Sequence, residues 1–209
     1  AQALGVSIPT VSRALTDSPE ISRELCAKAK ALAKEMNYRP NPFAMSLRKN
    51  APRIIGVVVP DIVTHFFASI LNGIENMAIA NGYFVIITTS HESYEHEKRN
   101  IENLVNMRVE GIIACLSQET TDFSHISALK DINMPLILFD RVCLTDQFSS
   151  VIADGAQSAQ MATQHLLDNG SERVAFIGGA NHLDIVKRRK LGYLGALREN
   201  RIPFDKELV

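Results

Sequence analysis

Arg13 and its neighbours are the side chains in this sequence whose type and spacing most clearly indicate a binding function. Arg13 follows Ile8 and Pro9 on one side of a predicted short helix, while Val11 and Ala14 fall on the opposite, apolar side. An arginine guanidinium can form two hydrogen bonds to the edge of a guanine, and isoleucine or proline can contact a thymine methyl group. The pattern therefore predicts a helix face that can read DNA bases.

The residues around this face resemble the parts of a helix-turn-helix. Gly5-Val6-Ser7 suits the tight turn, because glycine accepts a positive φ and Ser7 can cap the helix that follows. A further helix is predicted from Ser22 to Met36, with Ser22 at its start as a structural cap or as a contact to a DNA phosphate. Taken alone, the same residues also fit an ordinary surface helix in a small helical bundle.

The charge is unevenly distributed along the chain. Residues 1–53 contain nine Lys or Arg and four Asp or Glu, whereas the remaining residues contain thirteen and nineteen. The net charge of −1 is therefore the sum of a basic N-terminal segment, called the head below, and an acidic remainder. Such a head attracts phosphate groups, with an affinity that falls as salt rises. This distribution favours the DNA-reading interpretation over the ordinary surface helix.

A short segment, 39–52, joins the basic head to the rest of the chain. Asn41 can cap and Pro42 can begin a short helix, which is too short to be stable alone. Within it, Leu47 stands beside Arg48 and has the chemistry of a wedge in the DNA minor groove. From these residues alone, a linker with one exposed leucine is the simpler interpretation.

From Arg53 onward, apolar runs alternate with amphipathic segments. This alternation predicts a parallel sheet covered by helices on both faces, with ligands bound beyond the carboxyl ends of the strands. Strands are expected at 54–59, 83–89, 111–116, 136–139 and 174–178, and helices at 66–81, 95–107, 123–132, 155–169 and 185–199.

Composition and motifs narrow the classes of protein further. A chain of 209 residues with 46% hydrophobic content can hold a small module and one sizeable core. It contains no apolar run long enough to span a membrane, and we expect no signal peptide. Cys26, Cys115 and Cys143 lack zinc-type spacing and are expected to be buried packing residues in a reducing cytoplasm. The cluster from His91 to His96 does not match a zinc-protease motif. We therefore predict no enzyme, no cofactor and no metal.

The order and spacing of these segments resemble the LacI/GalR family of bacterial transcription regulators. The resemblance spans essentially the whole chain. The matching stretches are Gly5-Val6-Ser7 with Thr10-Val11-Ser12-Arg13, Asn37-Tyr38-Arg39-Pro40-Asn41 with Ala44 and Leu47, Ile55-Gly56-Val57 with Pro60-Asp61-Ile62, Val109-Glu110-Gly111-Ile112-Ile113, Gly170 with Arg173-Val174-Ala175-Phe176-Ile177-Gly178-Gly179, and Arg189 with Gly192-Tyr193.

The resemblance implies a cytoplasmic bacterial homodimer that binds double-stranded operator DNA and responds to a small-molecule effector, such as a sugar or related metabolite. The implied fold is an all-α helix-turn-helix DNA-binding head plus hinge, joined to an α/β periplasmic-binding-protein-like (type I) core with a parallel sheet. The implied domains are the head at 1–38, the hinge at 39–52 and the effector-binding and dimerisation core at 53–209. A solute-binding transport protein with the same core fold is the alternative.

The resemblance also assigns roles to residues. The DNA-binding set is Ser7, Ile8, Pro9, Thr10, Ser12, Arg13, Ser22, Asn41, Ala44, Leu47 and Arg48, with Leu47 as the intercalating leucine. The effector-binding set is Asp61, Phe66, Phe67, Asp140, Arg141, Asp154 and Arg189. Aromatic faces cover the C–H surface of a sugar, and Arg and Asp bind its hydroxyl groups. Many relatives have hydrogen-bonding residues at the positions of Ile8 and Pro9, so the operator sequence of a relative cannot be transferred to this chain. We also expect the sequence to be a fragment of a longer regulator.

Overall fold

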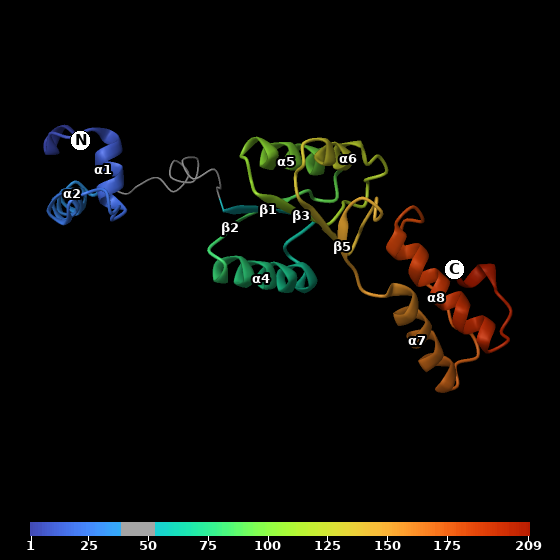
Figure 1. Ribbon diagram of the computed structural model, residues 1–209. Helices are drawn as coiled ribbons and strands as arrows, with labels where there is room; N and C mark the ends of the chain where they lie inside the picture. Colours follow the sequence, from blue (N-terminus) through green and yellow to red (C-terminus); the bar gives the residue numbers. More distant parts are fainter. Residues whose placement is uncertain (39–52) are drawn as a thin grey trace. The chain divides into compact units, whose positions relative to one another are not determined.

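The structure is a computed structural model that describes residues 1–38 and 53–209. The chain divides into two compact units, residues 1–51 and residues 52–209. Figure 1 colours both units along the sequence. The predicted hinge residues Asn41, Ala44, Leu47 and Arg48 lie outside the described residues.

The first unit has a turn followed by two helices, as its caps and apolar spacing predict. Its elements are the 3-10 helix η1 (Gln2–Leu4), α1 (Ile8–Leu15) and α2 (Arg23–Glu35). Gly5 adopts a φ of 62° after η1, the left-handed conformation that the tight turn was predicted to need. Ser7 and Ser22 cap α1 and α2, each accepting a hydrogen bond from the backbone three residues on.

A small apolar core holds α1 against α2. Ala14, Cys26 and Ala29 are buried at its centre, and Leu4, Leu15 and Ile21 pack around them. The predicted helix extends to Met36, but α2 ends at Glu35 and Met36 is its C-cap. Met36 therefore lies beyond the packed part of the helix, and it is 68% exposed.

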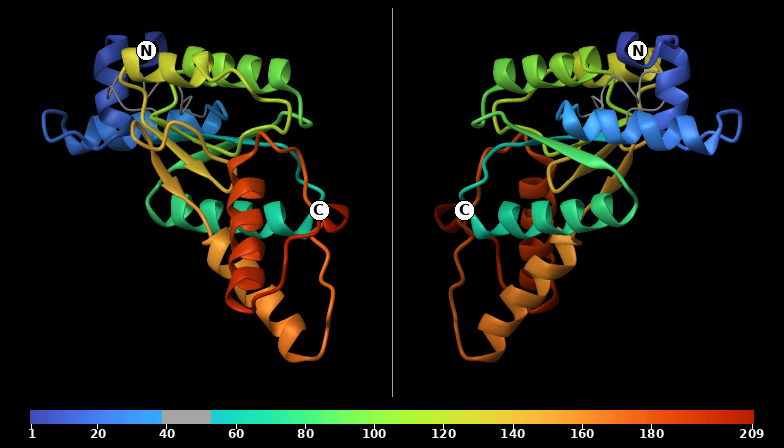
Figure 2. Two further views of the ribbon diagram at one scale, coloured as in Figure 1. Left: turned by 90° about the vertical axis from the view of Figure 1, so that its right-hand side faces the viewer. Right: turned by 90° about the vertical axis from the view of Figure 1, so that its left-hand side faces the viewer.

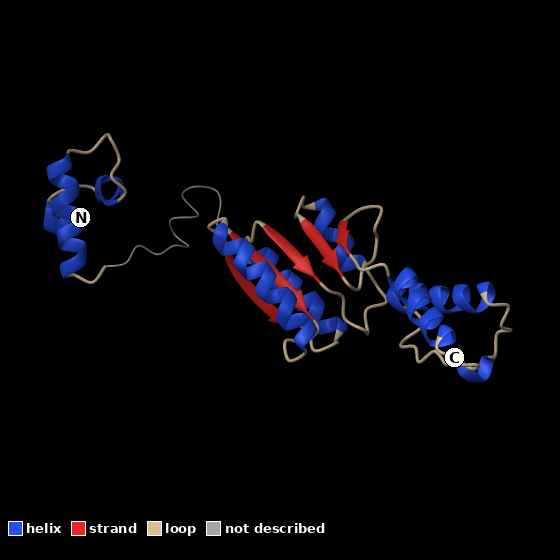
Figure 3. Cartoon of the chain, turned by 90° about the horizontal axis from the view of Figure 1, so that it is seen from below, coloured by secondary structure: helices blue, strands red, loops and turns tan. Residues whose placement is uncertain are grey.

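The second unit is built on a five-stranded sheet in the order β2-β1-β3-β4-β5, with every neighbouring pair parallel. Figure 3 shows these strands in red among the blue helices. The predicted parallel sheet is thus confirmed. Its elements are β1 (Ile54–Val59), α4 (His65–Ala80), β2 (Phe84–Thr89), α5 (Tyr94–Asn106), β3 (Gly111–Ala114), α6 (Ser124–Asp131), β4 (Leu136–Phe139) and β5 (Ser149–Val151).

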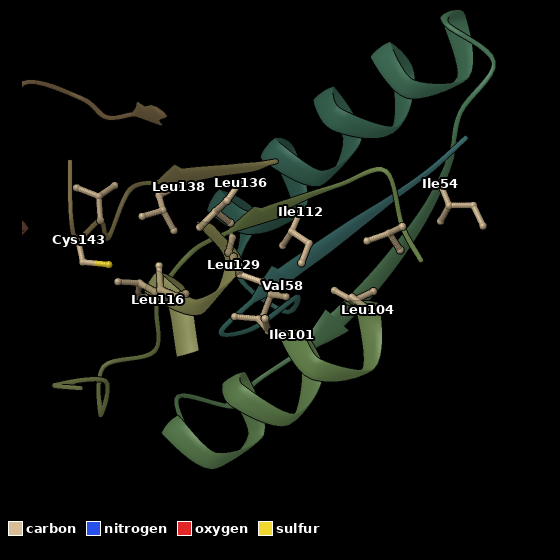
Figure 4. Close-up of a cluster of buried hydrophobic side chains, with 14 residues drawn as sticks. Ile54, Val58, Ile101, Leu104, Ile112, Leu116, Leu129, Leu136, Leu138 and Cys143 are labelled. Atoms are coloured by element: carbon tan, nitrogen blue, oxygen red, sulfur yellow. The ribbon is translucent and has the colours of Figure 1, made fainter. Parts of the chain in front are cut away.

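Helices lie on both faces of this sheet: Figure 1 shows α5 and α6 on one side and α4 on the other. On the α5 side, Val58 and Ile112 of the sheet pack with Ile101 and Leu104 of α5 (Figure 4). On the α4 side, a second cluster gathers Val57, Val59, Phe67, Leu71, Cys115 and Phe139. Alternate residues of β1 therefore enter opposite clusters, which explains why the strand is apolar throughout.

Beyond β5 the chain forms a pair of packed helices, α7 (Gly155–Asp168) and α8 (Asp184–Glu199), followed by the 3-10 helix η2 (Lys206–Leu208). Figure 2 shows this pair from two further sides. Tyr193 of α8 is buried, and its hydroxyl donates to the Val174 carbonyl oxygen at 2.8 Å. This bond ties the segment between the two helices back onto α8.

The strand predicted at 174–178 is not formed, and β5 was not predicted. Phe176 donates one backbone hydrogen bond to Leu208, at 2.7 Å, and Ile177 is 97% exposed. The segment is extended but has no neighbouring strand among the described residues, so its apolar character produces no ladder. β5 escaped prediction because Ser149 and Ser150 do not have the composition of a buried strand.

All three cysteines are free and buried, as predicted. Burial raises the pKa of Cys115 and of Cys143 to about 12 in each case. Within the described ranges 1–38 and 53–209, no helix has the length and apolar content needed to cross a membrane.

Candidate functional site

The outward face of α1 carries the side chains that the sequence assigns to base reading. Ile8 is 77% exposed, and Pro9 and Arg13 are also exposed, while Ala14 on the opposite face is fully buried. The cap fixes the start of this helix: the Thr10 N–H donates to Ser7 Oγ at 3.3 Å, and the two hydroxyl oxygens are 2.8 Å apart. A short rigid helix therefore presents an apolar pair and a cation together.

Arg13 forms an ion pair with Glu20, with 2.9 Å between Arg13 Nη1 and Glu20 Oε2. Both side chains are more than half exposed, at 51% and 67%. Ion pairs of this kind contribute about 0 to 1 kcal/mol, so Arg13 can exchange its partner at little cost. Arg13 is therefore held only weakly by Glu20 and is available to an incoming acceptor.

The two other serines assigned to DNA contact lie on the same unit. Ser22 is exposed, and its Oγ accepts a hydrogen bond from the Leu25 N–H at 3.3 Å. Ser12 is half-buried on α1. Ser22 thus performs the capping role, one of the two alternatives predicted for it, and because its Oγ accepts in this bond, its hydroxyl proton can still be donated to a phosphate.

A cavity of about 590 Å³ opens in the second unit between α4, the strand ends and the start of α8. Phe66, Asp140 and Arg189, all predicted effector residues, line it together with a mostly apolar wall that includes Ile113, Ile137 and Phe139. We call it the effector cavity. Its volume lies within the roughly 300 to 1,000 Å³ of small-molecule sites.

Asp140 and Arg189 give this cavity its polar character. Burial raises the pKa of the Asp140 carboxyl above its ordinary value, and the Arg141 and Arg189 cations offset this only in part. Arg189 is exposed and forms no hydrogen bond or ion pair with the residues that the structure describes. A free guanidinium and a carboxylate in one cavity can bind the hydroxyl groups of a polar ligand.

Three of the predicted effector residues have other contacts. Phe67 is 6% exposed and packs edge to face against Phe66, with ring centroids 5.2 Å apart, so it supports the wall from within the core. Asp154 caps α7 by accepting from the Gln157 N–H at 2.9 Å. Asp61 accepts from the Val63 N–H, also at 2.9 Å, in the loop after β1. Their contact with a ligand stays a prediction.

Arg141, the remaining predicted effector residue, is held by Glu92. Its Nη1 and Nη2 lie 2.6 and 3.0 Å from the two carboxylate oxygens of Glu92, and Nη1 also donates to the Leu116 carbonyl oxygen at 3.2 Å. The same Glu92 carboxylate accepts from the Gln118 N–H at 2.7 Å. The bidentate pair therefore ties the loop after β4 to the loop after β2, and the bonds to Leu116 and Gln118 connect both to the loop after β3.

A buried network that the sequence did not reveal fixes the loop after β3. Glu97 is fully buried on α5 and accepts hydrogen bonds from the Ser117 N–H and from the Thr120 hydroxyl, the latter at 2.9 Å. His125 Nε2 lies 2.9 Å from the same carboxylate. A signal was present in the sequence, because Glu97 stands at i, i+4, i+7 spacing with Ile101 and Leu104 on the apolar stripe of α5.

The loop after β3 also contacts the segment that leads into α8. His182 Nε2 lies 2.7 Å from the Gln118 carbonyl oxygen. Since α8 carries Arg189, this contact connects the sheet edge with the helix that lines the effector cavity. Among the described residues, no group of His, Cys, Asp and Glu side chains has an arrangement suited to a metal ion.

The chain is similar to known proteins both in sequence and in structure. Residues 53–209 match the model of periplasmic binding proteins and the sugar binding domain of the LacI family, and residues 1–41 match that of bacterial regulatory proteins of the lacI family. The catabolite control protein A of Priestia megaterium is 31% identical over 97% of this chain and 61% of its own length. The ribose operon repressor of Bacillus subtilis is 31% identical over 98% and 61%.

A solved structure of the lac repressor dimer bound to operator and the anti-inducer ONPF is also similar. It has a TM-score of 0.78 at 26% identity, over 97% of this chain and 61% of that one. The chain thus spans about three fifths of the length of these relatives. Its helix-turn-helix head and its type I periplasmic-binding-like core with a parallel sheet are both present in them.

Proposed function

The chain belongs to the lacI family of bacterial regulatory proteins, and from this premise we propose that it is a sequence-specific DNA-binding transcriptional regulator, a repressor controlled by a small-molecule effector. One observation carries the proposal. A single chain holds both a capped helix whose outward face exposes Ile8, Pro9 and Arg13 and a core with a cavity at the carboxyl edge of its sheet. A transport protein with the same core would need only the second of these.

DNA binding is assigned to the outward face of α1. Ile8, Pro9 and Arg13 would contact base edges in the major groove, and Thr10, Ser12 and Ser22 would contact phosphates. The exposed Ile8 and the exchangeable Arg13–Glu20 ion pair support this assignment. A cytoplasmic location follows from the proposed role, because the operator is in the bacterial cytoplasm.

The effector is assigned to the cavity that holds Phe66, Asp140 and Arg189. A sugar or related metabolite fits this chemistry, since the Phe66 ring can cover a C–H surface while the charged pair binds hydroxyl groups. In the proposed mechanism, effector binding changes the arrangement of the core and thereby the hinge at 39–52, which includes Leu47. The hinge would then favour or disfavour operator binding.

Homodimerisation is part of the same proposal. Met77 of α4 and Phe84 of the neighbouring β2 are 67% and 65% exposed. Exposed apolar surface is a common feature of protein interfaces. A second copy of the chain would cover them and would place two heads on a palindromic operator.

The test of DNA reading starts with operator selection. Full-length protein is incubated with random duplexes, bound sequences are recovered, and the selected site is used to compare Arg13→Ala with Arg13→Lys. If Arg13 reads a guanine, both variants lose about 1 to 3 kcal/mol of discrimination, and the lysine variant keeps its non-specific binding. Failure to select any sequence, with ligand binding intact, would favour the transport-protein alternative.

The test of effector binding is a thermal-shift screen of full-length protein against sugars, sugar phosphates and nucleobases. A bound compound raises the unfolding temperature by an amount that grows with the logarithm of its free concentration relative to its Kd. Arg189→Ala should abolish this shift and leave operator binding nearly unchanged. Arg198→Ala is the matched control, because Arg198 is an exposed residue of the same helix that does not line the cavity. Equal shifts in both variants would reject the role of Arg189.

A further inference from the structure

A second cavity, of about 260 Å³, lies beside the effector cavity. Its walls come from the loop after β3, the loop after β4 and the segment entering α8, with Leu116, Phe123 and Cys143 among the apolar side chains. Figure 4 labels Leu116 and Cys143 in the buried cluster that forms one side of it. Asp184 and Arg188 line both cavities, so the two share a wall.

The charged lining of the second cavity is predominantly cationic. Arg141, Lys187 and Arg188 line it, against the single carboxylate of Asp184. Arg141 is occupied by Glu92, which is outside the lining, and Arg188 Nε is paired with Asp184. Lys187 is exposed and has no hydrogen bond or ion pair with any described residue, so its ammonium charge is uncompensated.

The pair between Arg188 and Asp184 is a weak competitor for a strong anion. The two side chains are 43% and 44% exposed, and ion pairs at such exposure contribute little to stability. A phosphate monoester carries a charge of about −1.5 to −2 at pH 7 and offers three acceptor oxygens. It could therefore take Arg188 from Asp184 in a bidentate contact and neutralise Lys187 at the same time.

We propose that this second cavity is a phosphate subsite, formed by Lys187 and Arg188 with Arg141 also in its lining, for a phosphorylated small metabolite. Its position rests on the proposed function, because it adjoins the effector cavity across the Asp184–Arg188 pair. A phosphate that displaces Asp184 from Arg188 changes the wall of both cavities. The effector and the phosphate group therefore influence each other's binding through this pair.

The test uses inorganic phosphate as the probe and the full-length protein. Phosphate is titrated at constant ionic strength against chloride, and binding is followed by thermal shift and by calorimetry. Lys187→Gln and Arg188→Gln should each weaken phosphate binding about tenfold, the loss expected for one charge-assisted hydrogen bond. Lys190→Gln is the matched control on the same helix, since Lys190 lines neither cavity.

Asp184→Asn gives a readout that a merely structural role of these residues would not produce. Removal of the competing carboxylate should tighten phosphate binding by about two- to fivefold, opposite in direction to the lysine and arginine variants. The proposal is overturned if phosphate stabilises the protein no more than chloride does. It is also overturned if Lys187→Gln binds phosphate as well as Lys190→Gln does.

Two further measurements decide whether the phosphate group and the sugar belong to one ligand, and separate a failure of the subsite from a failure of the proposed function. Fructose 1-phosphate is compared with fructose and with inorganic phosphate, and tighter binding than either would put both groups on one molecule. Combined stabilisation by fructose and inorganic phosphate that departs from the sum of the two would show two separate ligands in coupled, adjoining cavities, whereas additive stabilisation would contradict the coupling through Asp184 and Arg188. Operator binding is measured on the same variants, so a protein that binds its operator but not phosphate contradicts only the subsite.

Discussion

Gly192 is the position where one added methyl group should be most damaging. A Cβ at this position would lie 1.9 Å from the Ala156 carbonyl oxygen, whereas ordinary contact begins at 3.4 Å, so α7 and α8 must separate by about 1.5 Å. Because the atom in the way belongs to the backbone and cannot rotate aside, we take the upper end of the usual cost of overpacking, a loss of about 3 kcal/mol in the free energy of unfolding. Alanine returns about 0.5 to 1 kcal/mol through its helix propensity, which leaves a net loss of about 2 kcal/mol.

The assay for Gly192→Ala is thermal unfolding followed by circular dichroism. A loss of about 2 kcal/mol in a chain of this size lowers the unfolding temperature by about 4 to 8 °C. Gly195→Ala is the control in the same helix, because its nearest contact would be a Gln160 side-chain atom at 3.7 Å, and it should be neutral or stabilising. A Gly192→Ala protein as stable as Gly195→Ala would refute the close packing of these helices.

Three further predictions concern buried groups. Glu97→Ala leaves the Ser117 N–H and the His125 imidazole without their acceptor. It should therefore lower the free energy of unfolding, measured by urea titration, by about 3 to 5 kcal/mol. A loss below about 1 kcal/mol would contradict the network. Burial raises the pKa of Asp140, so its ionised form costs stability above that pKa and the cost disappears as the pH falls through it. Asp140→Asn should therefore raise the unfolding temperature at pH 7 and leave it unchanged at pH 3, and an equal gain at both pH values would argue against ionisation as the cause. With pKa values of about 12, the thiols of Cys115 and Cys143 should resist an aromatic disulfide reagent at pH 8 until the protein unfolds, and rapid labelling of the folded protein would contradict their burial.

Local patterns in the sequence were sufficient to predict the elements that depend on local interactions. The caps at Ser7 and Ser22 and the turn at Gly5 act within a few residues, and all three have the predicted conformation. The parallel sheet could be predicted because a strand buried on both faces must be apolar at every position, as β1 is. These features require no knowledge of distant contacts.

The features that escaped prediction depend on partners far away in the sequence. The segment 174–178 is as apolar as a strand, but strand formation also needs a neighbour with free backbone groups, which its own composition does not supply. The Glu97 network joins residues 20 and 28 positions apart, and the donors to the Glu97 carboxylate could be identified only once the loop after β3 and α6 were placed against α5. The same holds for the Glu92 carboxylate that occupies Arg141.

The central claim is that the core controls the head, and it is tested most directly by operator affinity measured with and without effector. The measurement takes full-length protein, the selected operator and the compound found by thermal shift, at fixed salt. The account predicts a change of about 5- to 150-fold, the usual range of coupling between two sites, and its disappearance in Arg189→Ala. An operator affinity that stays the same at saturating effector would contradict the account.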